Sequence, residues 1–380
     1  MILERKLKLP NLLEKKSFFL LGPRSTGKST LLNHQLKGKA QIIDLLESDY
    51  FVRLSSRPQE LEEMIDKQKL GIVVIDEIQK VPTLLNEVHR LIEKKGIRFL
   101  LTGSNARKLK GEWTNLLAGR AWVAHLFPLS WSEIKNFDIE RYLLWGGLPQ
   151  VYLSRYPAEE LQAYVKTYLY EEIRAEAVVR KVPAFSRFLE VAALSSGQML
   201  NFTEIGNDAN VPPSTVREYY SALEDTLMGF MLPPWTKSKK RKAIKTGKFY
   251  FFDVGVKHAL ARTRQLERNS DLYGHAFEHF LAMELRAYID YARLPEELKF
   301  WRSIHGQEVD FVVGDRVAVE VKATQKISDK HFRGMLALKE EGIFEKYYLV
   351  TQDKIERKRE TIQCLHWETF LSKLWGGEII

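Results

Sequence analysis

Cysteine is nearly absent from this chain, since its 380 residues include one, Cys364. A single cysteine excludes an internal disulfide framework and a metal site built from several cysteines. Uncharged stretches such as 142–154 and 191–203 are shorter than the roughly 20 apolar residues that cross a bilayer. The N-terminal residues lead into no apolar core of a signal peptide. We therefore expect a soluble, cytoplasmic protein that does not bind a membrane.

Acidic residues are outnumbered by basic ones. The 58 lysines and arginines exceed the 49 aspartates and glutamates, which gives a formal net charge of +9. Such a surplus favours a polyanionic partner, and nucleic acid before a membrane surface. Hydrophobic residues make up 45% of the chain and charged residues 28%, the proportions of a globular protein rather than a disordered one.

The order of apolar runs predicts an α/β protein with several domains. Residues 17–21, 72–75 and 98–102 are short apolar runs with little alternation, which is typical of parallel strands buried on both faces. Mostly helical segments follow to about residue 195, and mixed α/β character returns from residue 249. Internal repeats and low-complexity tails are lacking.

The clearest motif is a phosphate-binding loop, GPRSTGKS at 22–29, which matches G-x-x-x-x-G-K-[ST] without a gap. It lies between a predicted strand and a helical stretch, where backbone N–H groups and a helix N-terminus can bind phosphate. We expect Lys28 to reach the β- and γ-phosphates and the Ser29 hydroxyl to bind Mg²⁺. The predicted nucleotide site comprises Gly22, Pro23, Arg24, Ser25, Thr26, Gly27, Lys28, Ser29 and Thr30.

Two acidic residues follow the apolar run 72–75. A carboxylate at the end of a buried strand is costly unless it meets a cation, so we expect Asp76 to bind Mg²⁺. Glu77 is then placed to act as general base on the attacking water. Asn105, in the polar segment 102–105, is a candidate to orient that water. Arg120 is a candidate arginine finger for a neighbouring subunit's nucleotide, although a surface ion pair explains its position equally well.

Residues 201–227 predict a helix-turn-helix with a tight break at 211–213. We expect Thr203 to cap the first helix and Ser214 the second. The side chains predicted to pack the helices together are Ala209, Val216, Tyr219, Leu223 and Leu227. This leaves Ser214, Thr215 and Arg217 facing outward, where a recognition helix meets base edges.

Strands at 229–235 and 248–252 are predicted to flank a basic loop. Its cationic side chains would form a wing against DNA phosphates. They include Lys239, Lys240, Arg241, Lys242 and, at the second strand, Lys248. The alternative is a winged helix that contacts protein and whose lysines are merely solvated. The concentration of charge favours DNA.

Two alternating strands, 308–313 and 317–322, carry a third set of functional candidates. Two carboxylates and a lysine among valines are expensive to desolvate unless they share a metal. We expect Asp310 and Glu320 to bind Mg²⁺, Glu278 from an upstream helix to complete or support the site, and Lys322 to position the attacking water. A buried Glu–Lys ion pair between edge strands is the alternative.

The connection between these strands decides whether the two carboxylates can meet. Directly opposed residues of an antiparallel hairpin point to the same face of the sheet. A two-residue loop would pair Asp310 with Val319, whereas a three-residue loop at 314–316 sets Asp310 opposite Glu320. We therefore predict an odd-length connection or a bulge, with Asp310, Glu320 and Lys322 on one face.

Taken together, these motifs resemble a prokaryotic family of AAA-type ATPases fused to a restriction-endonuclease-like, PD-(D/E)XK domain. The resemblance spans almost the whole chain and rests on GPRSTGKS, VVIDEIQKVP, LLTGSNARKL, LLAGRAWVAHLFPLSWSEI, YLLWGGLPQ, FYFFDVG and GQEVDFVV with VAVEVKA. The family's loop usually carries Gln-Val where this chain has Ser25-Thr26, and Lys28 and Ser29 are unaffected. The resemblance implies a homo-oligomer formed around ATP, with Arg120 as the matching finger.

The expected architecture therefore has four parts. They are a P-loop AAA-type ATPase domain (1–135) with a parallel sheet, a helical connector (136–195), a winged helix-turn-helix (196–252) and a mixed α/β nuclease-like domain (253–380). The expected function is ATP-dependent DNA processing, with ATP and Mg²⁺ as cofactors and Mn²⁺ as an alternative metal at the nuclease-like site. The alternatives are a DNA translocase or junction-remodelling ATPase that uses the nuclease fold as a grip, and a non-catalytic, ATP-switched regulator.

Overall fold

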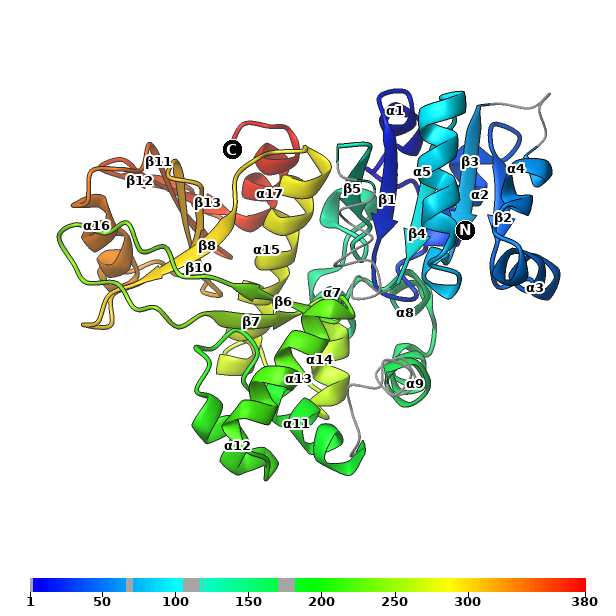
Figure 1. Ribbon diagram of the computed structural model, residues 1–380. Helices are drawn as coiled ribbons and strands as arrows, with labels where there is room; N and C mark the ends of the chain where they lie inside the picture. The colour runs from blue at the N-terminus through cyan, green and yellow to red at the C-terminus, as the bar shows by residue number, and fades with distance from the viewer. Residues whose placement is uncertain (1–2, 66–70, 105–116, 118, 170–181) are drawn as a thin grey trace. The chain divides into compact units, whose positions relative to one another are not determined.

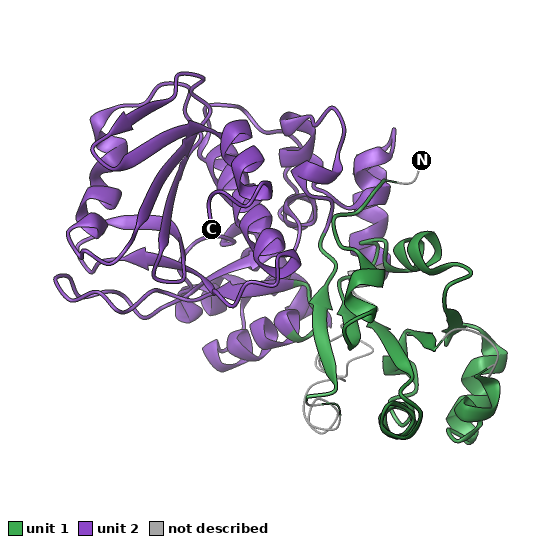
Figure 2. Ribbon diagram, turned by 90° about the horizontal axis from the view of Figure 1, so that it is seen from above, with its two compact units in different colours: residues 1–127, 225–228 green, residues 128–224, 229–380 purple. Residues whose placement is uncertain are grey.

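The computed structural model describes residues 3–65, 71–104, 117, 119–169 and 182–380. The chain divides into two compact units, residues 1–127 with 225–228 and residues 128–224 with 229–380 (Figure 2). The division into four parts is finer than this and stays a prediction. No helix of the described residues is long and apolar enough to cross a membrane.

A five-stranded parallel sheet is the centre of the first unit (Figure 1). Its strand order is β2-β3-β4-β1-β5, and every pairing is parallel. The strands are β1 (Ser17–Leu21), β2 (Gln41–Asp44), β3 (Ile72–Asp76), β4 (Arg98–Gly103) and β5 (Ala121–His125). The three predicted strands correspond to β1, β3 and β4. Their nearly complete burial explains why their sequences do not alternate.

Helices precede and connect the strands of this sheet. They are α1 (Leu9–Leu13), α2 (Lys28–Leu36), α3 (Ser48–Ser56), α4 (Glu60–Met64), the 3-10 turn η1 (Ile78–Lys80) and α5 (Leu84–Lys95). Helix α5 buries Leu84, Leu85, Val88 and Leu91, a helical spacing that forms one apolar stripe. This stripe belongs to the same core as Val73 and Phe99 of the sheet. The core fixes the strand ends that carry the polar motifs.

The second unit begins with a helical region. Its elements are η3 (Trp131–Glu133), α7 (Ile139–Trp145), α8 (Pro149–Leu153), α9 (Pro157–Ala163), η4 (Tyr164–Leu169), α11 (Val182–Leu194), α12 (Phe202–Ala209) and α13 (Pro213–Asp225). The antiparallel pair β6 (Gly229–Leu232) and β7 (Lys248–Phe251) and the helix α14 (Val254–Leu260) follow.

Helices α12 and α13 form the predicted pair, but their ends differ from the prediction. Asn201 rather than Thr203 caps α12, because its side chain accepts the N–H groups of Thr203 and Glu204 and asparagine is a strong N-cap. Helix α13 begins at Pro213, which suits the first helical position, so Ser214 lies inside the helix. Leu227 lies beyond the end of α13 and packs against the core of the first unit.

A six-stranded mixed sheet follows, in the order β12-β13-β11-β10-β9-β8. The strands are β8 (Leu298–Arg302), β9 (Glu308–Val313), β10 (Val317–Lys322), β11 (Lys346–Thr351), β12 (Arg357–Arg359) and β13 (Ile362–His366). The accompanying helices are α15 (Asp271–Tyr291), η5 (Asp329–Phe332), α16 (Arg333–Lys339) and α17 (Trp367–Trp375). The single cysteine, Cys364, is buried in β13. The predicted strands 308–313 and 317–322 correspond to β9 and β10, and the upstream helix that carries Glu278 is α15.

The basic loop between β6 and β7 runs alongside β8. Trp235 N–H donates to the Phe300 carbonyl at 2.6 Å, and Ile244 N–H donates to the Arg302 carbonyl at 3.0 Å. The Trp235 indole is buried in the core of the mixed sheet and donates to Asp315 at 2.8 Å. The loop is therefore anchored at both ends on this sheet, which differs from a wing that projects alone.

Two helical glycines give a test of this packing. A Cβ on Gly255 of α14 would lie 2.0 Å from the Trp145 carbonyl oxygen, whereas a Cβ on Gly274 of α15 meets no atom within 4 Å. We expect Gly255→Ala to lower the free energy of unfolding by about 1–3 kcal/mol through overpacking. Gly274→Ala should raise it by roughly 0.5–1 kcal/mol, because alanine loses less backbone entropy. Urea unfolding of both variants measures the difference, and equal effects would contradict the close approach of α14 to α7.

Candidate functional site

The phosphate-binding loop joins the end of β1 to the start of α2. Ser25 and Gly27 have positive φ angles of 62° and 93°, which turn the backbone into the first residues of the helix. Lys28 is buried, and its Nζ donates to the carbonyls of Gly22 at 2.7 Å and Pro23 at 3.1 Å. The loop thus has the conformation and the lysine that a phosphate cradle requires.

Arg5 supports this loop through a hydrogen bond to its backbone. Its guanidinium is buried and donates to the Thr26 carbonyl at 2.8 Å and to the Phe127 carbonyl at 2.6 Å. The Thr26 hydroxyl in turn donates to the Pro23 carbonyl at 2.8 Å. Arg24, Ser29 and Thr30 are exposed, and Ser25 and Gly27 are half-buried. The loop is therefore held on its inner side, and its outer side is open to a ligand.

Asp76 lies at the end of β3 and meets the loop through Ser29. The Ser29 hydroxyl donates to Asp76 Oδ2 at 3.0 Å, and the Thr102 hydroxyl donates to Asp76 Oδ1. Asp76 is 3% exposed, and among the described residues its carboxylate accepts from the neutral hydroxyls of Ser29 and Thr102. A buried carboxylate without a cationic partner is costly. The hydroxyl of Ser29 and the carboxylate of Asp76 are the oxygen ligands that Mg²⁺ prefers, so these residues fit the ion.

Glu77 follows directly in a left-handed backbone conformation, with φ of 60°. Its N–H donates to the Thr102 hydroxyl at 2.9 Å. The Ser104 hydroxyl at 3.4 Å and the Gln79 side-chain amide both donate to Glu77 Oε2. A non-glycine residue in this region is strained, and such strain clusters at functional sites. The neighbouring polar groups hold the carboxylate in one position.

Two further candidates of the first unit have different outcomes. Asn105 lies outside the described residues. Arg120 donates from Nε to Glu93 Oε1 at 2.5 Å, which is the surface ion pair that the sequence left open. Its role as an arginine finger stays a prediction.

The predicted carboxylate hairpin has a three-residue connection. β9 and β10 pair Val313 with Val317 and Phe311 with Val319, and this register sets Asp310 opposite Glu320. Asp310 Oδ2 accepts the Val321 N–H at 2.8 Å, and Glu320 Oε2 accepts the Asp310 N–H at 3.3 Å. Lys322 Nζ lies 2.6 Å from Glu320 Oε1 and 3.6 Å from Asp310 Oδ2. The geometric prediction for these three residues is confirmed.

Glu278 of α15 belongs to a second half of the same cluster. It contacts Lys248 at 3.2 Å and accepts a hydrogen bond from the Tyr250 hydroxyl at 2.5 Å. Lys248 also pairs with Glu308 at 2.7 Å. Lys248, expected as part of a phosphate-binding wing, is 4% exposed and is instead a buried counter-ion. Its position at the start of β7, against α15 and β9, explains the difference.

Burial and mutual repulsion set the protonation of this cluster. Burial, together with the charge of Asp310, raises the pKa of Glu320 to about 8. Burial also raises the pKa of Glu278, with Lys248 opposing and Asp310 adding to the shift. Burial alone would lower the pKa of Lys322, but Asp310 and Glu320 hold it above its ordinary value. The cluster thus carries more acidic than basic groups and would gain from a cation.

The carboxylates fit a divalent cation in chemistry, although two lysines contact them. Their oxygens are the ligands that Mg²⁺ and Mn²⁺ take. Among the described ranges, no three acidic, histidine or cysteine side chains are already arranged to hold a metal ion. In this structure Lys248, Lys322 and Arg302, which pairs with Glu308 at 2.7 Å, supply the positive charge. A metal at Asp310 and Glu320 requires the Lys322 ammonium to move aside.

The predicted DNA contacts divide into two groups. Ser214 and Arg217 on α13 are exposed and Thr215 is half-buried, and the Arg217 guanidinium lies 4.9 Å above the Phe202 ring. Of the loop residues, Arg241 donates to the Ala337 carbonyl at 2.9 Å and to Glu340 at 2.8 Å. The backbone N–H groups of Lys239 and Lys240 donate to Glu341. The side chains of Lys239, Lys240 and Lys242 are exposed.

The sequence analysis did not identify the roles of three supporting residues. Arg5 is one of several basic residues near the N-terminus, and no local pattern marks it as a loop support. Thr102 lies in the polar segment 102–105, and its hydroxyl donates to Asp76 and accepts the Glu77 backbone N–H. Glu308 begins β9, two residues before Asp310, and its alternation with Asp310 was the available signal.

Comparisons with protein families divide the chain into three matches. Residues 14–135 match the model of an AAA domain family. Residues 136–267 and residues 273–370 each match a domain of unknown function.

Three relatives that match most of this chain are described as uncharacterized proteins. Proteins of Mycobacterium bovis and Mycobacterium tuberculosis are each 27% identical over 321 residues, which cover 80% of this chain and 70% of theirs. A protein of Haemophilus influenzae is 26% identical over 319 residues, which cover 78% of both chains.

Solved structures give weaker matches. A Walker-type ATPase of Pyrococcus abyssi has a TM-score of 0.47 and 17% identity, with coverage of 67% of this chain and 93% of its own. The ORC1 protein of Aeropyrum pernix, solved in complex with DNA, has a TM-score of 0.24 and 14% identity, with coverage of 69% and 93%.

The family match and the geometry agree for the first unit. The phosphate-binding loop follows β1 and the acidic pair lies at the end of β3. In the parallel sheet, β4 lies between these two strands. The carboxyl ends of the strands are where ligands bind in open parallel sheets. Residues 14–135 therefore match an AAA domain family and have the parallel sheet and loop geometry of a P-loop nucleotide site.

Proposed function

We propose that this protein is an ATP-dependent DNA-processing enzyme that couples ATP hydrolysis in the first unit to DNA binding and metal-dependent DNA cleavage in the second. The observation that carries the second half is the register of β9 and β10, which sets Asp310 opposite Glu320. Lys322 contacts both carboxylates. Two buried acids and a lysine on one face of a sheet are a costly arrangement, and a catalytic role accounts for its presence.

In the first unit, Lys28 and the loop N–H groups would hold the β- and γ-phosphates. Ser29 and Asp76 would hold Mg²⁺, and Glu77 would take the proton of the attacking water. Ser104 and Gln79 position the Glu77 carboxylate through the contacts described above. Arg120 would complete the site of a neighbouring subunit once its ion pair with Glu93 opens.

In the second unit, Asp310 and Glu320 would hold Mg²⁺ or Mn²⁺, with Glu278 in support. A bound metal supplies charge stabilisation at the scissile phosphate. Lys322, freed from the carboxylates, would position the attacking water. Ser214, Thr215 and Arg217 on α13, with Lys239, Lys240 and Lys242 on the loop, would contact DNA.

A specific observation supports one second candidate. Lys248 and Lys322 already offset part of the negative charge of the carboxylates, so the cluster has counter-ions without a metal. In that case the second unit grips DNA without cutting it, and the protein is an ATP-switched regulator or a translocase. Cleavage assays separate the two candidates.

The first prediction concerns ATP. Lys28→Ala should abolish ATP binding, because the phosphates lose their cation. Glu77→Gln should keep binding but lower kcat by at least about 100-fold, because the water loses its base. Fluorescent-nucleotide titration and phosphate release measure the two effects. Glu93→Gln, which removes the partner of Arg120, serves as a control for folding and should leave nucleotide binding intact. Normal turnover in Glu77→Gln would exclude Glu77 as the base.

The second prediction concerns DNA. Replacing Lys239, Lys240 and Lys242 with alanine should weaken binding without changing sequence preference. Each lost phosphate contact should reduce the log–log salt slope by about 0.9. Arg241→Ala is the matched control, because its guanidinium is already paired with Glu340 and its loss should change the slope little. An unchanged slope in the triple variant would assign the loop to protein contacts.

The third prediction concerns cleavage. Asp310→Asn should lower metal affinity by more than about tenfold and remove DNA cleavage with Mg²⁺ or Mn²⁺, while ATP hydrolysis persists. Asp315→Asn, at the turn of the same hairpin, is the control because Asp315 contacts Trp235 and Lys237 instead. Cleavage of single-stranded, duplex and branched DNA is measured with and without ATP. Wild-type protein that cuts none of them would favour the regulator or translocase.

A further inference from the structure

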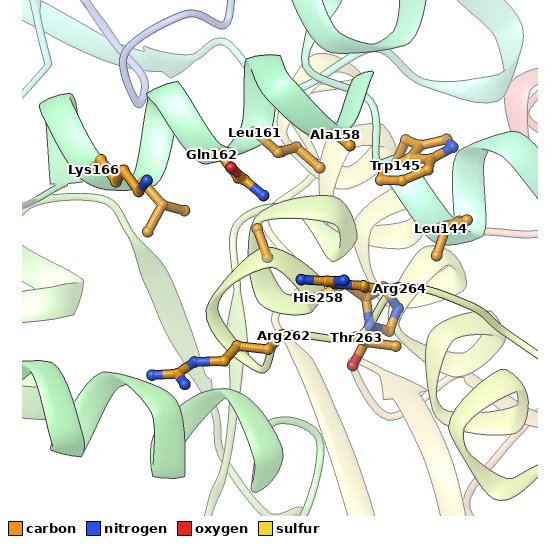
Figure 3. A pocket seen from close by; sticks show the side chains of 12 residues that line it. Leu144, Trp145, Ala158, Leu161, Gln162, Lys166, His258, Arg262, Thr263 and Arg264 are labelled. Atoms are coloured by element: carbon orange, nitrogen blue, oxygen red, sulfur yellow. The ribbon is translucent and has the colours of Figure 1, made fainter. Parts of the chain in front are cut away.

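The second unit contains a cavity that none of these functions uses. It has a volume of about 610 Å³ and lies between α9 with the following turn η4 on one side and α14 on the other (Figure 3). Leu144, Trp145 and Leu161 contribute apolar and aromatic surface. Sites for small molecules occupy roughly 300–1,000 Å³ and combine such walls with a few polar groups. The cavity has the size and the walls of a ligand site.

All the charged side chains in the described lining of the cavity are cationic. Lys166, Arg262 and Arg264 line the cavity, and its described lining includes no acidic side chain. Arg262 pairs with Glu190 at 3.0 Å on the neighbouring helix α11. Within the described part of the chain, Lys166 and Arg264 are exposed and contact no carboxylate. Two available cations beside an apolar wall favour a ligand that is both anionic and partly apolar.

His258 adds a buried polar group to this cavity. His258 is 1% exposed, and neither ring nitrogen makes a hydrogen bond of ordinary geometry to a described residue, although the Leu143 carbonyl faces one of them. Figure 3 shows the ring between the α9 side chains and those of Arg262 and Thr263. Burial lowers the pKa of His258 well below its ordinary value, and the charge of Lys257 and the neighbouring His279 add to this. The carbonyl of Leu143 opposes the shift. The neutral ring can therefore donate with one nitrogen and accept with the other.

Most buried polar groups in proteins have a partner, so the ring nitrogen that does not face the Leu143 carbonyl indicates a missing one. We propose that this cavity binds a small organic anion of about nucleotide size. Its phosphate or carboxylate group pairs with Lys166 and Arg264, its apolar body contacts Trp145 and Leu161, and His258 hydrogen-bonds a polar atom of that body. The site is separate from the phosphate-binding loop, and the proposal does not depend on the proposed function.

The test uses full-length Lys28→Ala protein, so that nucleotides do not bind at the phosphate-binding loop. Adenosine monophosphate, 1-naphthyl phosphate and decanoate are titrated calorimetrically, with adenosine and inorganic phosphate as controls that each lack one half of the ligand. We expect at least one amphipathic anion to bind with a Kd below about 1 mM and both controls to bind more weakly. Tighter binding of adenosine monophosphate or 1-naphthyl phosphate would indicate a phosphate ligand, and tighter binding of decanoate would indicate a carboxylate ligand.

Variants of the cavity identify the location. Lys166→Gln and Arg264→Gln should each weaken binding by roughly tenfold, the loss expected for one charge-assisted contact. Arg155→Gln is the matched control, since Arg155 is exposed and lies outside the lining. His258→Phe should weaken binding and at the same time raise the melting temperature, because it replaces buried nitrogens that make no hydrogen bond of ordinary geometry with carbon. A structural histidine would instead lower the melting temperature when replaced.

Three results would overturn the proposal. They are the absence of binding below about 1 mM for all three anions, affinities that ignore Lys166 and Arg264, and a melting temperature that falls in His258→Phe. If none of the three anions binds and the melting temperature of His258→Phe is raised, the cavity holds water rather than an organic anion.

Discussion

The second unit depends on the burial of acidic side chains beside one another. Asp310 and Glu320 lie on adjacent strands, and Glu278 and Glu308 approach from α15 and the start of β9. Buried carboxylates in contact are unstable unless cations compensate them. Lys322 does so from within β10, and Lys248 does so from β7. Because one counter-ion comes from β7, the segment that precedes the mixed sheet must stay attached to it.

Because of this constraint, the basic loop is an anchored segment of the second unit rather than a free arm. Lysines in a run suggest a solvated arm, but the loop ends on a residue that is needed inside the carboxylate cluster. Its backbone also follows β8 and bonds to Glu341. The exposed lysines are therefore displayed on an anchored edge, at a fixed position relative to Asp310 and Glu320. A phosphate backbone that follows this edge would be guided along the same sheet.

Much of this arrangement could be predicted from the sequence. The phosphate-binding loop and the acidic pair are local patterns, and their strands are short apolar runs that leave little choice of element. The pairing of Asp310 with Glu320 follows from strand period and loop length alone. Arg5 and Lys248 could not be predicted in the same way, because their partners lie far along the chain and depend on tertiary packing. The caps of α12 and α13 were missed because several residues near each helix start can serve as caps.

Cys364 has a consequence for future measurements on this protein. The thiol is buried in β13, and burial raises its pKa, so the reactive thiolate is scarce at neutral pH. As it is the one cysteine in the chain, the native protein is nearly inert to maleimides. A cysteine introduced on an exposed surface would then carry a fluorophore or crosslinker at a single position. A pair of introduced cysteines, one in each unit, would report the distance between the units without first removing a native thiol.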